Sequence, residues 1–321
     1  MIFKKVMKRA NQMNQLNSWK RVMVSIAFSG LLCSFPLLSN AEEVPYVSGN
    51  TNIQGNFEKG NIQSAKDKKL FKPGKDELIS PFDAEDESHY TSSDNSLGFS
   101  YVPNFNFGVS ILPDEKSLNI AGKLQNYSKL TEGSEIDYEY YMQAFFILQD
   151  VRGTNSGWRV QLQATPFVNK LSADDVIVGS AIYLSGAKVY SNGVEGDKLI
   201  NYLDRKEAYQ PLLTADELIN DKEPTTNLGN RYYLKEVDSS YKDITTVAQD
   251  ILAAPVGSGA GTTYFVFDQT YEPDFEWSWN KDSYENVLRT PAQILRVPQG
   301  AVTEKGKAYQ SDLTWSIIAG P

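Results

Sequence analysis

Two tryptophan-bearing segments, far apart in the chain, constrain its fold more than any other feature. In the first, every second position is apolar, namely Trp158, Val160, Leu162 and Ala164. The positions between and after them are polar, namely Arg159, Gln161, Gln163 and Thr165. Near the C-terminus, apolar and polar residues alternate in the same way through Leu313, Thr314, Trp315, Ser316 and Ile317. A strict two-residue period is typical of a half-buried strand, so both segments are predicted to be strands with one apolar and one polar face.

The apolar faces of these segments are predicted to lie in the protein core. Each tryptophan shares its strand face with Val, Leu or Ile, which favours burial over an exposed platform for a sugar ring. The predicted core residues are Trp158, Val160, Leu162, Leu313, Trp315 and Ile317.

The polar faces supply the candidate binding residues. If the two strands pair, their donors and acceptors form one patch that suits the hydroxyl and acetamido groups of a glycan. The candidate binding residues are Arg159, Gln161, Gln163, Thr314 and Ser316.

Residues 96–321 are predicted to form one all-β domain, an antiparallel sandwich with Greek-key-like topology. Aromatic and β-branched segments alternate there with glycine-rich turns. Strand patterns run over residues 138–148 and 182–190, and Asn192-Gly193 predicts a hairpin turn after the second. The polar stretch 195–250 predicts an insertion or covering lobe, in which Thr214-Ala215 offers a helix start.

The N-terminal residues predict export. Residues 1–41 have a basic start, an apolar stretch and a Ser39-Asn40-Ala41 end, which is typical of a cleaved signal peptide. An uncleaved membrane anchor is the alternative, although the apolar stretch is short for a span. Residues 42–95 are polar and lack a hydrophobic period, which predicts a flexible linker or loosely docked arm, with an extra strand as the alternative.

Charge and cysteine content exclude several classes of protein. The chain has a net charge of −9, and its first 41 residues hold six basic and no acidic side chains, so the mature chain carries −15. Nucleic acid is a poor partner for such a chain. The one cysteine, Cys33, lies in the predicted signal, which leaves no disulfide, thiol nucleophile or thiolate metal site, and no membrane attachment is expected after cleavage.

No group of residues predicts catalysis, a cofactor or a metal. The one histidine, His89, falls in the acidic part of the predicted linker, which argues against a Ser-His-Asp triad or a zinc site. Neighbouring Asp174 and Asp175 point to opposite faces of a strand. Residues 257–261 lack the lysine of a phosphate loop and predict a turn. In residues 275–279, three aromatics share one face, which favours a buried stripe over a glycan platform.

Several blocks of the sequence resemble, in order, the WxL domain of Gram-positive surface proteins. The matching blocks are residues 97–99, 102–108, 151–158, 257–262, 297–301 and 309–316. The resemblance implies a β-rich domain that attaches non-covalently to peptidoglycan and associates with partner surface proteins. Val160 and Ile317 stand where the family motif has leucine, and both are apolar, strand-favouring residues that a core position tolerates.

The resemblance and the predicted signal together imply a secreted, wall-associated anchor or scaffold. Its partner is then peptidoglycan or another cell-wall glycan. The alternative is a protein-interaction subunit of a surface complex, in which the 195–250 insertion or a strand edge meets another surface protein. A secreted glycan hydrolase is a third alternative, because scattered acidic residues can form a carboxylate pair across a cleft.

Overall fold

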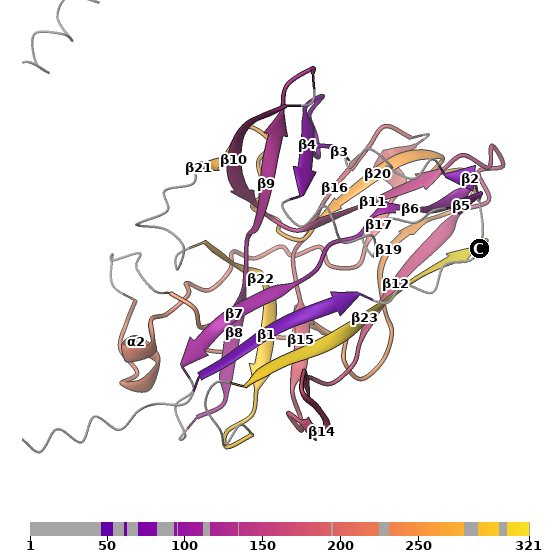
Figure 1. Cartoon of the computed structure of the whole chain (residues 1–321). Coiled ribbons are helices and arrows are strands. Elements are labelled where there is room, and N and C mark those ends of the chain that lie inside the picture. The colour runs from indigo at the N-terminus through magenta and orange to yellow at the C-terminus, as the bar shows by residue number, and fades with distance from the viewer. Residues whose placement is uncertain are drawn as a thin grey trace, which may run out of the picture. The chain divides into compact units, whose positions relative to one another are not determined.

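The protein is built almost entirely from short β-strands, and nearly all of the strand pairs are antiparallel (Figure 1). The computed structural model describes residues 46–53, 61–62, 70–81, 93–94, 96–111, 116–133, 135–193, 195–224, 231–278, 288–301 and 307–320. The predicted all-β antiparallel class is confirmed, and the Greek-key sandwich stays a prediction. The predicted signal peptide lies outside the described residues. Within those residues, no helix has the length and hydropathy of a membrane span.

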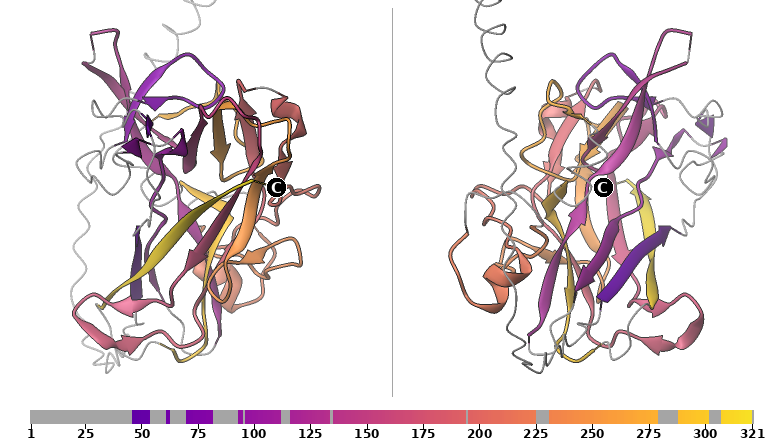
Figure 2. Two further views of the ribbon diagram at one scale, coloured as in Figure 1. Left: turned by 90° about the vertical axis from the view of Figure 1, so that its right-hand side faces the viewer. Right: turned by 60° about the vertical axis from the view of Figure 1, so that its left-hand side comes forward.

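The two tryptophan-bearing segments are neighbouring strands of one eight-stranded sheet, the motif sheet. β12 (Trp158–Ala164) pairs antiparallel with β23 (Ala308–Ala319). The strand order is β14 (Ser172–Val176), β13 (Val168–Asn169), β23, β12, β19 (Gln249–Ala254) and β17 (Ile200–Asn201). The sheet is extended by β1 (Tyr46–Ile53), which runs parallel to β23, and by β7 (Asn106–Ile111), which pairs with β1. Figures 1 and 2 show indigo β1 beside yellow β23.

Three further sheets and a two-stranded ribbon complete the described fold. The central sheet has the order β16 (Lys188–Ser191), β20 (Gly261–Val266), β11 (Phe145–Asp150) and β6 (Leu97–Tyr101). The hairpin sheet has the order β21 (Trp277–Ser278), β10 (Ile136–Met142), β9 (Gln125–Leu130), β4 (Leu78–Pro81) and β3 (Leu70–Phe71). The third sheet has the order β18 (Lys242–Asp243), β15 (Ala181–Leu184), β22 (Arg289–Val297) and β8 (Leu118–Lys123). The ribbon pairs β2 (Asn61–Ile62) with β5 (Ser93–Asp94).

Both faces of β11, an inner strand of the central sheet, are buried. Successive residues of a strand point to opposite faces. Phe146 and Leu148 of β11 therefore pack into the larger core cluster, which also holds both tryptophans. Phe145 and Ile147 pack on the other side, into a second cluster with tyrosines of the hairpin sheet. Burial on both sides explains why these four consecutive residues are all apolar instead of alternating.

Two segments that the sequence predicts as single strands are each divided in two. Residues 138–148 form parts of β10 and β11, which separate at Gln143-Ala144 and belong to different sheets. Residues 182–190 form parts of β15 and β16, which also belong to different sheets. The predicted hairpin at Asn192-Gly193 is wrong: β16 pairs with β20, and the chain continues into a short 3-10 helix, η2 (Gly196–Lys198). A hydrophobic period does not reveal where a strand changes sheets.

The chain leaves the sheet of β15 at Gly186 and then enters β16 in the central sheet. Gly186 has a φ of 74°, and its amide donates to the Leu203 carbonyl oxygen at 2.7 Å. An added Cβ would collide with the Tyr209 hydroxyl. We expect Gly186→Ala to lower the free energy of unfolding by about 1–3 kcal/mol, measured by urea denaturation. Gly153→Ala is the control, because Gly153 has a φ of 69° but open space around it. An equal loss in both variants would contradict the collision with Tyr209.

The described part of the predicted linker, residues 42–95, is incorporated into the sheets. β1 belongs to the motif sheet, and β3 with β4 forms a hairpin at the edge of the hairpin sheet. Leu70, Lys72 and Ile79 of this hairpin are all buried. The structure here differs from a flexible arm and matches the extra-strand alternative. In this hairpin a lysine, Lys72, takes a buried position two residues after Leu70, so the buried positions here do not appear as an apolar period.

The predicted insertion, residues 195–250, contains the predicted helix. α2 (Ala215–Ile219) begins after Thr214, whose hydroxyl accepts from the Glu217 amide at 3.2 Å. The Glu217 carboxylate accepts in return from the Thr214 amide at 2.9 Å, which completes a capping box. Leu218 of this helix packs into the larger core cluster. The described part of this segment therefore contributes side chains to the core, and its role as an insertion or covering lobe stays a prediction.

Candidate functional site

The pairing of β12 with β23 brings the five candidate binding residues onto one sheet face. Gln161 lies opposite Ser316, and Gln163 lies opposite Thr314. The side chains of Arg159 and Gln163 are exposed, and the other three residues are half-buried. We call this surface the β12–β23 patch: Arg159, Gln161, Gln163, Thr314 and Ser316.

Asp250 of the neighbouring strand β19 orders one side of the patch. Its Oδ1 accepts from Gln161 Nε2 at 2.8 Å and lies 3.3 Å from Arg159 Nε. Within the described ranges, no side-chain hydrogen bond engages Gln163, Thr314 or Ser316. The patch therefore combines two oriented side chains with three that can still bond a ligand.

The opposite face of the same two strands is buried. Trp158 and Trp315 are 1% and 0% exposed. Trp158 Nε1 donates to the Gly259 carbonyl oxygen at 3.1 Å. Trp315 is surrounded by phenylalanine rings at centroid distances of 5.8, 5.5 and 6.0 Å, those of Phe99, Phe146 and Phe267. Val160, Leu162 and Leu313 are fully buried, whereas Ile317 near the end of β23 is half-buried.

The loop before β12 is fastened at three points. The Arg152 guanidinium donates to both carboxylate oxygens of Asp150 at 2.9 and 2.8 Å and to the Gly157 carbonyl oxygen at 2.8 Å. The Gly257 amide donates to the Asn155 carbonyl oxygen at 2.7 Å, and the Gly320 amide bonds to the Gly157 carbonyl oxygen at 3.3 Å. The loop 151–157, the glycine-rich turn and the end of β23 are therefore held together beside the patch.

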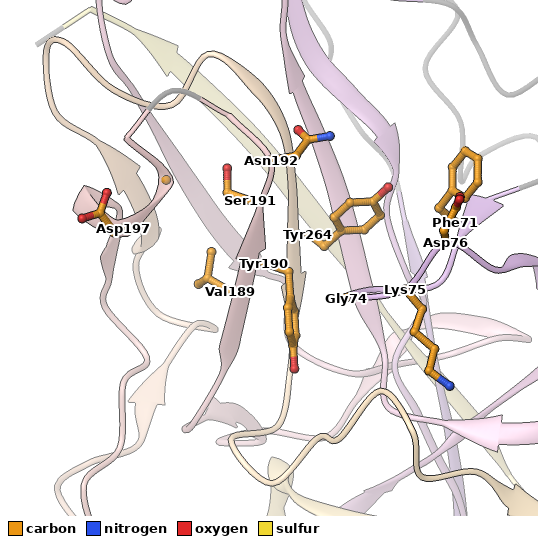
Figure 3. Close-up of a pocket in the computed structure, with 11 residues that line it drawn as sticks. Phe71, Gly74, Lys75, Asp76, Val189, Tyr190, Ser191, Asn192, Asp197 and Tyr264 are labelled. Atoms are coloured by element: carbon orange, nitrogen blue, oxygen red, sulfur yellow. The ribbon is translucent and has the colours of Figure 1, made fainter.

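A second surface, which the sequence reasoning missed, is a cleft of about 650 Å³ between the β3–β4 hairpin and the edge of the central sheet. Small-molecule sites commonly measure about 300–1,000 Å³. We call it the Tyr264 cleft. Figure 3 shows Tyr264 between the side chains of β16 and those of the hairpin. Its lining includes Phe71, Asp76, Tyr190, Asn192, Asp197 and Tyr264.

Both tyrosines of this cleft are neutral at physiological pH. Burial raises the pKa of Tyr264 above its ordinary value, and nearby Asp76 adds to the shift. Burial and then Glu272 raise the pKa of Tyr190 in the same direction. A neutral phenol offers an uncharged ring face together with a hydroxyl that can donate or accept.

A comparison with models of known protein families identifies the family of this chain. The family model described as "WxL domain surface cell wall-binding" matches residues 47–321. The chain belongs to this WxL family. No curated protein and no solved structure matches the chain significantly. The family match begins within β1, so it includes the described strands of the predicted linker.

Membership of the WxL family makes this a cell-surface domain that binds the cell wall. The family is a binding family and not a catalytic one. In this WxL domain the two tryptophans face the core, and the polar residues that alternate with the apolar ones along β12 and β23 face outward.

The remaining sequence candidates do not form a site. Asp174 is exposed, while Asp175 accepts from Lys307 Nζ at 2.6 Å, and this bond holds the pKa of Asp175 below its usual range. Phe275 is 57% exposed, so the predicted buried stripe does not include it. His89 and Trp279 lie outside the described residues. Among the side chains that are described, no group of three or more His, Cys, Asp or Glu residues could hold a metal ion.

Proposed function

We propose that this protein attaches non-covalently to the Gram-positive cell wall, with peptidoglycan as its ligand, and serves as an anchor or scaffold at the cell surface. Residues 1–41 would direct its secretion. Family membership supports wall binding. The observation that carries the proposed site is the outward face of β12–β23, where polar side chains lie directly opposite one another.

The chemistry of the β12–β23 patch fits an uncharged glycan. Arg159 offers donors, Thr314 and Ser316 offer hydroxyls, and the two glutamines offer both donors and acceptors. The chain carries a net charge of −9, so bulk attraction to a polyanionic wall does not assist binding. Hydrogen bonds and shape must supply the affinity, and Asp250 reduces the cost of ordering Arg159 and Gln161 in advance.

The double variant Arg159→Ala/Gln161→Ala tests this site. We expect it to weaken sedimentation with purified peptidoglycan by about tenfold in Kd, because it removes donors whose joint contribution we put at about 1.4 kcal/mol. The matched control is Arg296→Ala/Gln299→Ala, which removes exposed residues outside the patch. Unchanged wall binding by a folded patch variant would overturn the assignment of this face.

The same assay separates the other functions. Purified protein that sediments with bare peptidoglycan needs no partner protein, whereas sedimentation only in the presence of a second surface protein would favour an interaction subunit. We expect no new reducing ends on the wall glycan during incubation, and their appearance would favour a hydrolase.

A further inference from the structure

The floor of the Tyr264 cleft continues the buried face of the central sheet. Ile147, Tyr264 and Tyr190 lie side by side on three neighbouring strands. Ile147 is covered by the second core cluster. Tyr264 and Tyr190 pack against the edge of that cluster and are only partly buried. The second core cluster does not extend over Tyr264 and Tyr190, so their two rings form the floor of the cleft.

The hairpin of β3 and β4 fixes one of these rings. Gly74, with a φ of 75°, lies so close to Tyr190 that an added Cβ would be 2.8 Å from the ring. On another side Tyr190 makes an edge-to-face contact with Tyr271, at 5.9 Å between centroids and 83° between planes. A ring held in advance loses little entropy when a ligand stacks on it.

The rim of the cleft carries hydrogen-bonding groups. Asp76, Asn192 and Asp197 are exposed. Asn192 Oδ1 accepts from the Thr262 amide at 2.9 Å, which leaves the Nδ2 donors facing solvent. In the part of the chain that the structure describes, neither Asp76 nor Asp197 is hydrogen-bonded or ion-paired. Figure 3 shows Asp76 and Asn192 on opposite sides of Tyr264.

The charge of the rim selects the kind of ligand. Among the described residues that line the cleft, the one cation is Lys75, which is paired with Asp274 at 2.9 Å, so the carboxylates of Asp76 and Asp197 dominate the rim. Carboxylates accept hydrogen bonds from sugar hydroxyls but repel phosphate groups. Aromatic faces suit the apolar face of a sugar ring.

We propose that the Tyr264 cleft binds a short uncharged segment of wall glycan built of N-acetylhexosamine units. This proposal rests on the proposed function and gives it a second contact site, separate from the β12–β23 patch. Sugar rings lie against Tyr264, Tyr190 and the exposed ring of Phe71. Hydroxyls donate to Asp76 and Asp197, and Asn192 Nδ2 donates to an acetamido oxygen.

Isothermal titration of the purified protein with the chitin tetrasaccharide tests the site directly. Phe71→Ala and Asp76→Asn change exposed side chains of the cleft, so both variants are expected to fold. Each is expected to weaken tetrasaccharide binding at least about tenfold. The matched controls Phe275→Ala and Asp174→Asn, which change exposed residues outside the cleft, are expected to bind as the native protein does.

Sedimentation with peptidoglycan separates failure of this proposal from failure of the proposed function. Absence of wall binding by the native protein overturns the proposed function and this inference with it. Native wall binding with no measurable affinity for the tetrasaccharide, or with equal affinity in cleft and control variants, overturns the cleft alone. Tighter binding of a polyanionic teichoic acid than of the tetrasaccharide also overturns it.

Discussion

Trp315→Ala and Trp158→Ala are each expected to lower the free energy of unfolding by about 3–5 kcal/mol. Both indoles are buried, and removing either leaves a cavity among rigid rings and strand side chains. A loss of this size is a large fraction of the about 5–15 kcal/mol that stabilises a typical domain. Urea unfolding followed by circular dichroism measures it without relying on tryptophan fluorescence. Ile318→Ala, at an exposed position of β23, is the control and should change stability little. A native-like midpoint for either tryptophan variant would contradict its role in the core.

Phenylalanine substitutions separate the two tryptophans. Trp158→Phe removes the hydrogen bond to Gly259, whereas Trp315 Nε1 is buried without a hydrogen-bond partner among the described residues. Trp158→Phe leaves the Gly259 carbonyl oxygen without this donor, and leaving a buried polar group unsatisfied costs about 1–3 kcal/mol. Trp158→Phe should therefore destabilise the protein more than Trp315→Phe does. The reverse order would mean that the Trp158 bond contributes nothing.

The sequence predicted best the strands that have one face in solvent. β12 and β23 each have one buried face, so the alternation of apolar and polar residues from Trp158 to Ala164 and from Leu313 to Ile317 correctly predicted each strand and which of its faces is buried. Alternation failed for Phe145–Leu148, because both faces of β11 are buried and the run is continuously apolar. It also failed to locate Gly186, where the chain leaves one sheet for another.

The candidate surfaces differ in the same way. The β12–β23 patch consists of residues at neighbouring positions on two strands, so it could be proposed once pairing was assumed. The Tyr264 cleft combines Phe71 of β3, Tyr190 of β16 and Tyr264 of β20. No local pattern links these segments, and their proximity depends on docking of a hairpin whose sequence resembles a polar linker. Such a cleft becomes visible only after the sheets are placed together.

Lys72→Ala is expected to lower the free energy of unfolding by about 3 kcal/mol, because it removes one member of a buried ion pair. The Lys72 side chain is 0% exposed, and its Nζ lies 2.7 Å from Glu276 Oε1 and 3.7 Å from Glu77 Oε1. It also lies 4.8 Å from the centre of the Tyr140 ring. Without this cation, Glu276 loses its ion-pair partner and the Tyr140 ring loses its cation, while Glu77 keeps Lys129 Nζ at 3.0 Å. This loss of about 3 kcal/mol is at the lower end of the range for breaking a buried ion pair, because the Glu276 side chain is 22% exposed and stays partly hydrated.

Lys75→Ala is the matched control for this substitution, since it changes a lysine of the same hairpin whose partner Asp274 is 92% exposed. An exposed pair of this kind contributes little, so its loss should leave the urea midpoint nearly unchanged. Hydrogen exchange of the β4 amides should also accelerate in Lys72→Ala and not in Lys75→Ala, because β4 is the strand of this hairpin that pairs with β9. Equal stability and equal exchange in the two variants would mean that the hairpin is not docked. Residues 42–95 would then be the flexible arm that their composition predicts, and the Tyr264 cleft would lose the wall that Phe71 and Asp76 provide.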